Sequence, residues 1–320
     1  MVSLASGFLE QVEQALLARV TPQNVVTGPG SLIARIARHL TGARGAHRVR
    51  PLTVQVVGTC LGAAPERLVD LAVAAEMIHT ASLFHDDVVD EGTERRGIPT
   101  ANARFGNAAA VLAGDWVLSR AFGTLQSYPN ALTVYAVDLV AEMSIGALGE
   151  VEARGRWNLT PQDWTWLAER KCGLLFGFAA RSAALVAGKG ELAQPLHDQF
   201  TSLGVAFQKA DDLKDVLDGG SGKNRFADLA NQNPSWAIAH AVQSSPAFGR
   251  ALAAAWAEGQ PLAPLQKELT ALCQPLVAPL EAELGAAAAA VSNLLGPSSE
   301  PALQAFLAHT WGHLPRKAVA

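Results

Sequence analysis

Two aspartate clusters of the same form are the side chains in this sequence best suited to chemistry. They are Asp86, Asp87 and Asp90, and Asp211, Asp212 and Asp215. Each cluster lies in an apolar stretch with helical spacing, so its first and last carboxylates, at positions i and i+4, share one face. Carboxylates stacked in this way destabilise a helix unless a cation lies between them. Two such helices facing each other across a cavity would hold hard divalent ions, with Mg²⁺ as the expected ion, which complete their shell with water and phosphate oxygens. The pattern predicts a metal-dependent enzyme that acts on a phosphorylated or diphosphorylated substrate.

The composition indicates a helical protein with a large core. The chain has 320 residues, of which 49% are apolar and only 6% aromatic, with much alanine and leucine. That bias favours helix over sheet. The length alone suggests about two domains, but nothing marks a boundary, and we expect one all-α domain over residues 1–320. The net charge of −4 argues against a general nucleic-acid binder.

The hydrophobic periodicity predicts long helices and no strand. The expected helices cover residues 3–20, 31–41, 52–62, 65–90, 108–127, 132–154, 163–187 and 192–216, with several shorter ones from residue 235 on. Residues 91–107 and 218–222 are predicted loops, and Thr160 is the expected N-cap of a helix that starts at Pro161. The helix that ends in the first cluster is apolar on all sides up to His79, so it should be central. Such a helix is a poor place for carboxylates unless they serve a site.

The cysteines and the N-terminus bear on the compartment. Cys60, Cys172 and Cys273 are isolated and lack metal-binding spacing, as expected of reduced thiols in a cytoplasmic protein. Residues 1–17 contain two glutamates and no basic segment, so they predict an amphipathic helix and not a signal peptide. No run of about 18 uncharged apolar residues is present, and we expect no transmembrane segment.

The motifs resemble those of a known family. Residues 79–90 resemble the first aspartate-rich motif of the trans-polyprenyl diphosphate synthases, and Arg95 and Arg96 follow at that family's spacing. Residues 204–215 resemble the second motif, and Gly222-Lys223 resembles the glycine-lysine pair downstream of it. The resemblance covers roughly residues 30–240 with order and spacing kept, and it is nearest to medium- and long-chain, octaprenyl-type synthases. It implies an isoprenoid-synthase-type helical bundle around a central cavity.

The resemblance also implies a reaction. Family members ionise an allylic diphosphate, and the carbocation attacks isopentenyl diphosphate head to tail, with pyrophosphate as the expected proton acceptor. Charge neutralisation of the leaving diphosphate is a Lewis-acid role, which implies Mg²⁺, three ions per site, with Mn²⁺ as a substitute. The cavity wall must otherwise be apolar and dry, because water would quench the cation.

Roles follow from the matched positions. Asp86, Asp90 and Asp211 are the expected main metal ligands, with Asp87, Asp212 and Asp215 completing the metal-binding set. Lys171 and Lys223 join those three ligands as expected catalytic residues. The allylic diphosphate would be held by Arg95, Lys171, Gln208 and Lys223 through charge-assisted hydrogen bonds. The isopentenyl diphosphate would be held by His47, Arg48, Arg50, His79 and Arg96.

Two residues before the first cluster bear on the length of the product. Ala81 and Ser82 precede Asp86 by about one helical turn on the metal face, where the growing chain would run. Family members with bulky aromatic residues there stop short. Small side chains at these positions therefore predict a medium or long product, around an octaprenyl chain.

The sequence departs from the family at three positions. His47 and Asn233 stand where the family carries lysines that meet diphosphates, and Phe226 replaces a glycine four residues after Gly222. A histidine can donate a hydrogen bond but is positively charged only at lower pH. We expect weaker diphosphate binding or an altered pocket, not loss of activity.

Two alternatives stay open. One is a terpene-cyclase-like or head-to-head prenyl synthase on the same fold, against which Arg48, Arg50 and Arg96 speak. The other is a non-catalytic or weakly active subunit of a heteromeric synthase, which His47 and Asn233 keep possible although both aspartate sets are retained. The family is typically homodimeric, and apolar helices near residues 108–145 could supply the interface. A long prenyl product would also suit transient membrane contact.

Overall fold

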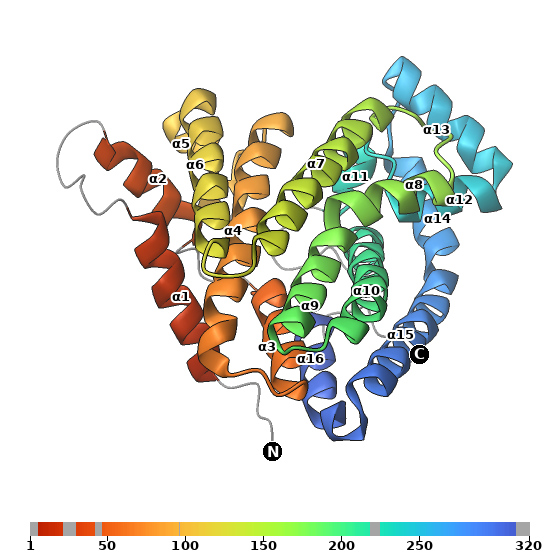
Figure 1. Ribbon diagram of the computed structural model, residues 1–320. Helices are drawn as coiled ribbons and strands as arrows, with labels where there is room; N and C mark the ends of the chain where they lie inside the picture. Colours follow the sequence, from red (N-terminus) through yellow and green to blue (C-terminus); the bar gives the residue numbers. More distant parts are fainter. Residues whose placement is uncertain (1–5, 22–29, 42–46, 96, 218–224, 312–320) are drawn as a thin grey trace. The chain divides into compact units, whose positions relative to one another are not determined.

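The computed structural model describes residues 6–21, 30–41, 47–95, 97–217 and 225–311. Nearly all of them are helical (Figure 1). The elements are α1 Ser6–Val20, α2 Gly30–Thr41, α3 Val49–Cys60, α4 Pro65–Val89, β1 Glu94–Arg95, β2 Ile98–Pro99, α5 Ala101–Phe105, α6 Asn107–Leu125, α7 Asn130–Ala153, α8 Pro161–Ala168, a π-helical turn Glu169–Gly173, α9 Leu174–Val186, α10 Gly190–Leu217, α11 Ala227–Ala230, α12 Trp236–Ser244, α13 Pro246–Glu258, α14 Ala263–Cys273, a 3₁₀ turn Gln274–Leu276, α15 Val277–Leu295, a 3₁₀ turn Pro297–Ser299 and α16 Glu300–Trp311. The predicted all-α fold class is confirmed.

The chain forms two compact units. The first comprises Met1–Val140, Phe178–His197 and Leu294–Phe306, and the second Ala141–Gly177, Asp198–Asn293 and Leu307–Ala320. The first aspartate cluster belongs to the first unit and the second cluster to the second. That residues 1–320 act as one domain stays a prediction.

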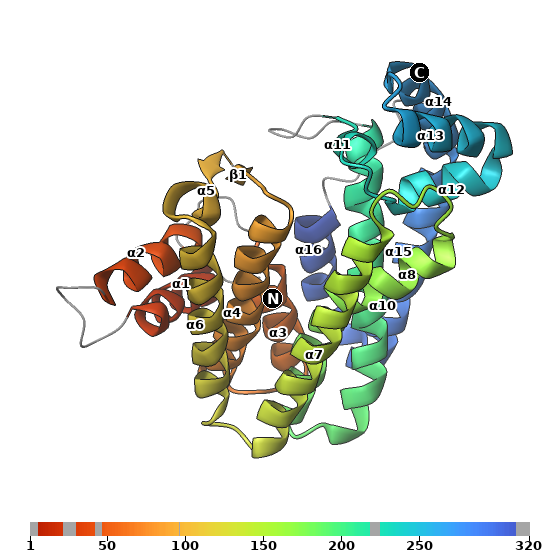
Figure 2. The ribbon, with the colours of Figure 1, turned by 90° about the horizontal axis from the view of Figure 1, so that it is seen from above.

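Helix α4 forms the core of the first unit. It packs against α6, α3 and α1 (Figures 1 and 2). Its residues Leu71 to Ile78 are all buried, as the sequence predicted for a helix that is apolar on every side. Pro65 occupies the first turn, where a missing N–H costs nothing. The helix ends at the first cluster, with Asp90 as its C-cap.

A short hairpin follows α4. Strands β1 and β2 pair antiparallel, with Arg95 opposite Ile98. The prediction of no strand was wrong here, because a ladder of two residues per strand is too short to show alternation. Thr100 then caps α5, its hydroxyl accepting a hydrogen bond from the N–H of Ala103. The hairpin thus carries Arg95 back toward the end of α4.

The second unit contains α8, the π-helical turn, most of α10, and the helices from α11 to α15. The predicted N-cap of α8 is confirmed as a full capping box, in which Thr160 and Asp163 each accept a bond from the other's backbone N–H. A π turn inserts one extra residue into a helix and is frequent at functional sites. Beside it, an added Cβ on Gly204 would lie 2.8 Å from the Cα of Gly173, so two backbones touch where only glycine fits.

Helix α7 is unusually apolar for its length. By length and composition alone it could cross a membrane, although it carries Asp138 and Glu142. Those carboxylates interrupt the apolar run, so the helix contains no run of about 18 uncharged apolar residues, which was the criterion applied to the sequence. Exposed apolar side chains follow one stripe of this helix at Val134, Val137, Ile145 and Leu148.

Candidate active site

The first cluster is arranged around a buried carboxylate. Asp87 is only 3% exposed. The Nε and Nη2 atoms of Arg95 donate to its Oδ1 over 2.9 and 2.7 Å. Among the described residues, its Oδ2 has no hydrogen-bond partner although it is buried. Asp86 is half-buried and Asp90 exposed. Asp87 therefore orients Arg95, while its neighbours reach toward solvent.

Two predicted ligands of isopentenyl diphosphate lie together in the first unit. The Nη1 atom of Arg50, in α3, lies 3.3 Å from Nε2 of His79, in α4. Since a guanidinium always donates, Nε2 of His79 accepts at this contact. His79 precedes Asp86 by about two helical turns. The two side chains form a basic pair between α3 and α4, the helix that carries the first cluster.

Arg48 is engaged inside the protein. Its Nη1 donates to Oε1 of Glu76 over 2.6 Å, and the two side chains are 5% and 4% exposed. Its Nε also lies 3.4 Å from Glu13. The backbone of Arg48 has φ 50°, ψ 37°, the left-handed region that L-residues seldom adopt. We expect this guanidinium to fix the start of α3 and so to position Arg50, not to contact a diphosphate directly.

The structure describes some of the remaining predicted site residues and not others. His47 is exposed immediately before Arg48. Arg96 and Lys223 lie outside the described residues. In the predicted product-length wall, Ala81 is 2% exposed, and Ser82 is half-buried with its hydroxyl donating to the carbonyl of His79 over 2.9 Å. Both wall positions lie on α4 and carry small side chains.

The second cluster also has a buried central member. Asp212 accepts from Nε2 of Gln208 over 3.0 Å and from the backbone N–H of Trp236 over 2.7 Å. Burial, followed by repulsion from Asp228, raises the pKa of Asp212 well above its usual range. Excess negative charge is therefore concentrated around this carboxylate.

The other two members of this cluster have separate positions. Asp215 accepts from the backbone N–H groups of Ala227 and Asp228 over 3.0 and 3.3 Å, and so anchors the start of α11. Asp211 is exposed. Of the three aspartates, Asp211 thus has the carboxylate most open to solvent.

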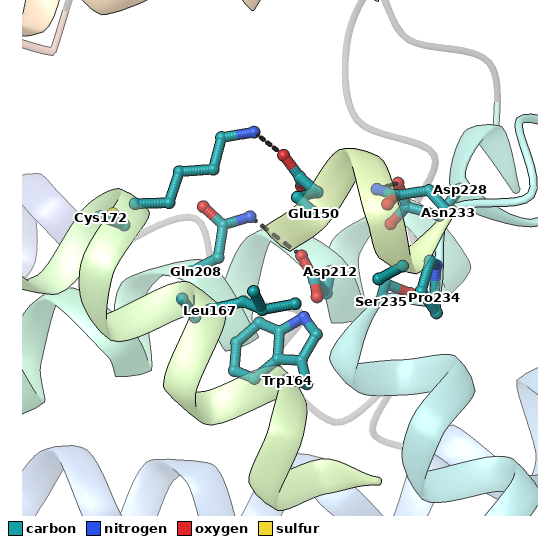
Figure 3. Close-up of a pocket in the computed structure, with 13 residues that line it drawn as sticks. Glu150, Trp164, Leu167, Cys172, Gln208, Asp212, Asp228, Asn233, Pro234 and Ser235 are labelled. Carbon is teal, nitrogen blue, oxygen red and sulfur yellow. Dashed lines mark hydrogen bonds and ion pairs between the residues drawn. The ribbon is translucent and has the colours of Figure 1, made fainter. Parts of the chain in front are cut away.

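A small pocket of about 90 Å³ lies beside Asp212, and Figure 3 shows the residues that line it. Lys171, from the π-helical turn, donates to Glu150 at the end of α7. Gln208 and Asp212 from α10 line the same pocket. The apolar part of the lining comes mainly from Trp164, Leu167 and Cys172. Predicted diphosphate-binding residues of the second unit, Lys171 and Gln208, are therefore brought together with an aspartate of the cluster.

Sequence reasoning gave too little weight to two carboxylates of this pocket. Glu150 pairs with Lys171, and Asp228 accepts from Nδ2 of Asn233 over 3.1 Å. Both lie in the pocket lining. Glu150 has no charge pattern around it that marks a site. Asp228 could have been found from its place after the second motif, at the start of a short helix.

Comparison with known proteins decides the family. A sequence model of polyprenyl synthetase matches residues 31–266. The octaprenyl diphosphate synthase of Haemophilus influenzae is 34% identical over 255 residues, which cover 78% of this chain and 75% of that protein. The chain belongs to the polyprenyl synthetase family. A geranylgeranyl diphosphate synthase of Rhodobacter capsulatus is 33% identical over 71% of this chain and 80% of that protein.

A solved structure agrees with this assignment. The polyprenyl synthase of Caulobacter crescentus, complexed with calcium and isoprenyl diphosphate, matches with a TM-score of 0.82 at 26% identity, over 96% of this chain and 95% of that chain. The predicted family, its all-α fold and the enzyme class, a trans-prenyltransferase, are thereby confirmed.

Polyprenyl synthases generally use divalent metal ions, and the carboxylates of this chain suit them. The partnerless buried Oδ2 of Asp87 and the repulsion around Asp212 are what a nearby cation would relieve. Within the described residues, no three Asp, Glu, His or Cys side chains gather into one site. That is compatible with Mg²⁺, which takes one or two carboxylates and fills its shell with water and phosphate oxygens.

The departures from the polyprenyl synthetase pattern have local physical consequences. Phe226, at the family's glycine position, adopts φ 62°, ψ 30°, which glycine would adopt without strain. The guanidinium of Arg225 lies over its ring at 4.7 Å. Asn233, at the family's lysine position, bonds Asp228 without adding a positive charge. The pocket therefore has one cation fewer than the family pattern supplies.

Proposed function

We propose that this protein condenses an allylic diphosphate with isopentenyl diphosphate, head to tail, to give a medium- or long-chain all-trans polyprenyl diphosphate and pyrophosphate. Family membership supports prenyl chain elongation. The observation that carries the residue-level proposal is the pairing of Arg50, in α3, with His79, in the helix α4 that ends at the first cluster. Two packed helices, α3 and α4, thus supply a basic pair for a diphosphate, and the end of α4 supplies carboxylates for cations.

In the proposed reaction the two substrates account for every bond that breaks or forms and for the proton that is released. The allylic C–O bond breaks, and its electron pair leaves with pyrophosphate. The double bond of isopentenyl diphosphate then attacks the allylic carbon, and the proton released is taken up by pyrophosphate. Mg²⁺ supplies the charge neutralisation that makes diphosphate a good leaving group.

The side chains divide into four groups. Asp86, Asp90 and Asp211 are the proposed metal ligands, for three Mg²⁺ or Mn²⁺ ions. Asp87, Asp212 and Asp215 act behind them, since each is engaged with Arg95, Gln208 or backbone N–H groups. Lys171, Lys223, Arg95 and Gln208 are proposed to bind the allylic diphosphate. His47, Arg50, His79 and Arg96 would bind the isopentenyl diphosphate, with Arg48 supporting them.

The proposed product is around octaprenyl in length. Its support is the small size of Ala81 and Ser82 on α4 and the identity to an octaprenyl diphosphate synthase. The geranylgeranyl synthase among the relatives marks the shorter end of the range. No disulfide joins the three cysteines in the described part of the chain, which suits the proposed cytoplasmic location.

A homodimer is proposed through α6 and α7. The exposed apolar stripe on α7, with Val137 and Leu148, and the exposed Leu112 on α6 support a second copy of this chain as the covering partner. Light scattering on the wild type and on Val137→Glu should give a dimer and a monomer, respectively. A monomeric wild type would reject the proposal.

The function is tested with the purified single chain. Labelled isopentenyl diphosphate, an allylic primer and Mg²⁺ should give labelled chains whose length is read by chromatography, and EDTA should abolish them. Asp86→Ala and Asp211→Ala should each remove nearly all turnover, while Asp163→Ala, an aspartate of a helix cap, should not. Absence of turnover without a second protein would favour the subunit alternative. Turnover of the allylic substrate alone would favour a cyclase.

A further inference from the structure

The first unit carries a surface of unbalanced positive charge. Between Glu13 and Glu66 the sequence has six arginines and no aspartate or glutamate, and between Glu94 and Asp115 it has three arginines and again no acid. These two acid-free segments meet where α2 packs on α5 and α6 (Figures 1 and 2). In a chain with net charge −4, such segregation makes a local positive field.

The basic side chains are organised around one aromatic ring. The guanidinium carbons of Arg35 and Arg104 lie 5.8 and 5.2 Å from the centroid of the Phe105 ring. His39 meets the same ring edge-on at 5.6 Å. Arg38 is exposed on the same helix. We call Arg35, Arg38, His39, Arg104 and Phe105 the basic surface.

Hydrogen bonds fix the orientation of the histidine at its centre. Nε2 of His39 lies 2.6 Å from the carbonyl of Pro99, so it must carry the proton that it donates. Its Nδ1 lies 3.3 Å from Nη1 of Arg104, which can only donate. His39 is therefore held between Pro99 and Arg104, and the permanent positive charge of the basic surface is that of the three arginines.

The charge of the three arginines is available to an external partner. Each is exposed. No carboxylate of the described residues forms an ion pair with any of them. An apolar side chain accompanies them, since Leu32 is 41% exposed and precedes Arg35 and His39 by three and seven positions on one helical face.

We propose that the basic surface docks this protein on an anionic lipid bilayer. Arginines beside an exposed leucine and a phenylalanine ring match a membrane interface, where cations meet lipid phosphates and apolar groups enter the acyl boundary. A groove for free phosphate would not need the apolar residues. The proposal rests on the proposed function in one respect, because a long polyprenyl product is soluble only in a membrane and docking would place the enzyme where that product must go.

Vesicle cosedimentation without substrates tests the surface directly. The variants are Arg35→Gln/Arg38→Gln/Arg104→Gln and, as a control of equal charge loss, Lys189→Gln/Arg250→Gln/Lys267→Gln, three exposed cations elsewhere. Each basic residue near an anionic surface contributes about fivefold in affinity, so the first triple should lose roughly 100-fold on phosphatidylglycerol-containing vesicles. The control should lose much less. A third variant with lysine at positions 35, 38 and 104 should keep most of the binding.

Several results would overturn the proposal. They are equal losses in the two glutamine triples, wild-type binding by the first triple, equal binding to pure phosphatidylcholine vesicles, or equally tight binding to duplex DNA or RNA. If the glutamine triple has a lowered melting temperature, the lysine variant decides, since it removes the same side chains but keeps the charge. Synthase turnover with a short, water-soluble primer is measured separately, so failure of the proposed function leaves the vesicle result standing, and the reverse.

Discussion

The buried ion pair between Arg48 and Glu76 allows a quantitative prediction about the first unit. In Arg48→Met the carboxylate of Glu76, only 4% exposed, would lose its partner at 2.6 Å. Removing one member of such a pair leaves an uncompensated buried charge and costs about 3–5 kcal/mol. Glu13, which also contacts Arg48, is 55% exposed, and its exposed pairing is worth about 0–1 kcal/mol. The left-handed backbone at position 48 stays the same in the methionine variant, so its strain cancels.

Thermal unfolding followed by circular dichroism measures the effect. A loss of 1 kcal/mol lowers the melting temperature of a domain of 150–250 residues by about 2–4 °C, so Arg48→Met should melt at least ~6 °C below the wild type. Arg48→Met/Glu76→Met should recover most of that loss, because a buried pair replaced by apolar groups is often neutral. Glu13→Gln should shift the transition by ~4 °C or less.

The reasoning is refuted if Arg48→Met melts within ~2 °C of the wild type, or if the double variant is less stable than the single one. Kinetics distinguish a supporting role of Arg48 from direct binding of the diphosphate by Arg48. If Arg48 only positions Arg50, the double variant should recover stability, and its KM for isopentenyl diphosphate should fall back toward the wild-type value. A KM that stays high in a fully stable double variant would instead make Arg48 a direct diphosphate ligand.

Three other sites also give testable predictions. Ala81→Phe should shorten the product, because a ring at this buried position of α4 would block the proposed chain path, and an unchanged chromatographic distribution would count against the assignment. Thr160→Ala should cost about 1 kcal/mol by removing the capping box of α8, measured by urea unfolding, whereas an effect below ~0.3 kcal/mol would mean that the cap is dispensable. Burial raises the pKa of the Cys273 thiol to about 12 from 9.0, with a smaller contribution from Asp212. The folded state then keeps a proton that the unfolded state loses, so stability should fall from about pH 9 to pH 12, and Cys273→Ala should flatten that decline in a pH series of melting temperatures.

The sequence was sufficient for features that depend on local chemistry. The central helix was predicted over 65–90 and is observed over Pro65–Val89, because its apolar run and N-terminal proline leave few alternatives. The cap at Thr160 was equally well specified. The two aspartate motifs, with their spacing to the basic residues that follow them, were enough to indicate the family.

Features that depend on tertiary contacts were beyond the sequence. The basic residues at positions 47, 48 and 50 do not reveal which guanidinium turns inward. Only the contact with Glu76 distinguishes the buried Arg48 from Arg50. Likewise, two adjacent aspartates look alike until one of them, Asp87, is found buried under Arg95. The hairpin that brings Arg95 there is too short to leave a periodic signal.

The π-helical turn at Glu169–Gly173 makes the pocket depend on a count of residues and not only on their identity. One extra residue in a helical turn rotates everything that follows by about 100° relative to an uninterrupted α-helix. Lys171, which lies in this turn, meets Glu150 in the observed phase. Deleting a single residue from the turn would convert it to ordinary α-helix and swing the lysine off the pocket, even with every lining side chain retained. Comparisons between homologues should therefore treat segment length here as a functional character in its own right.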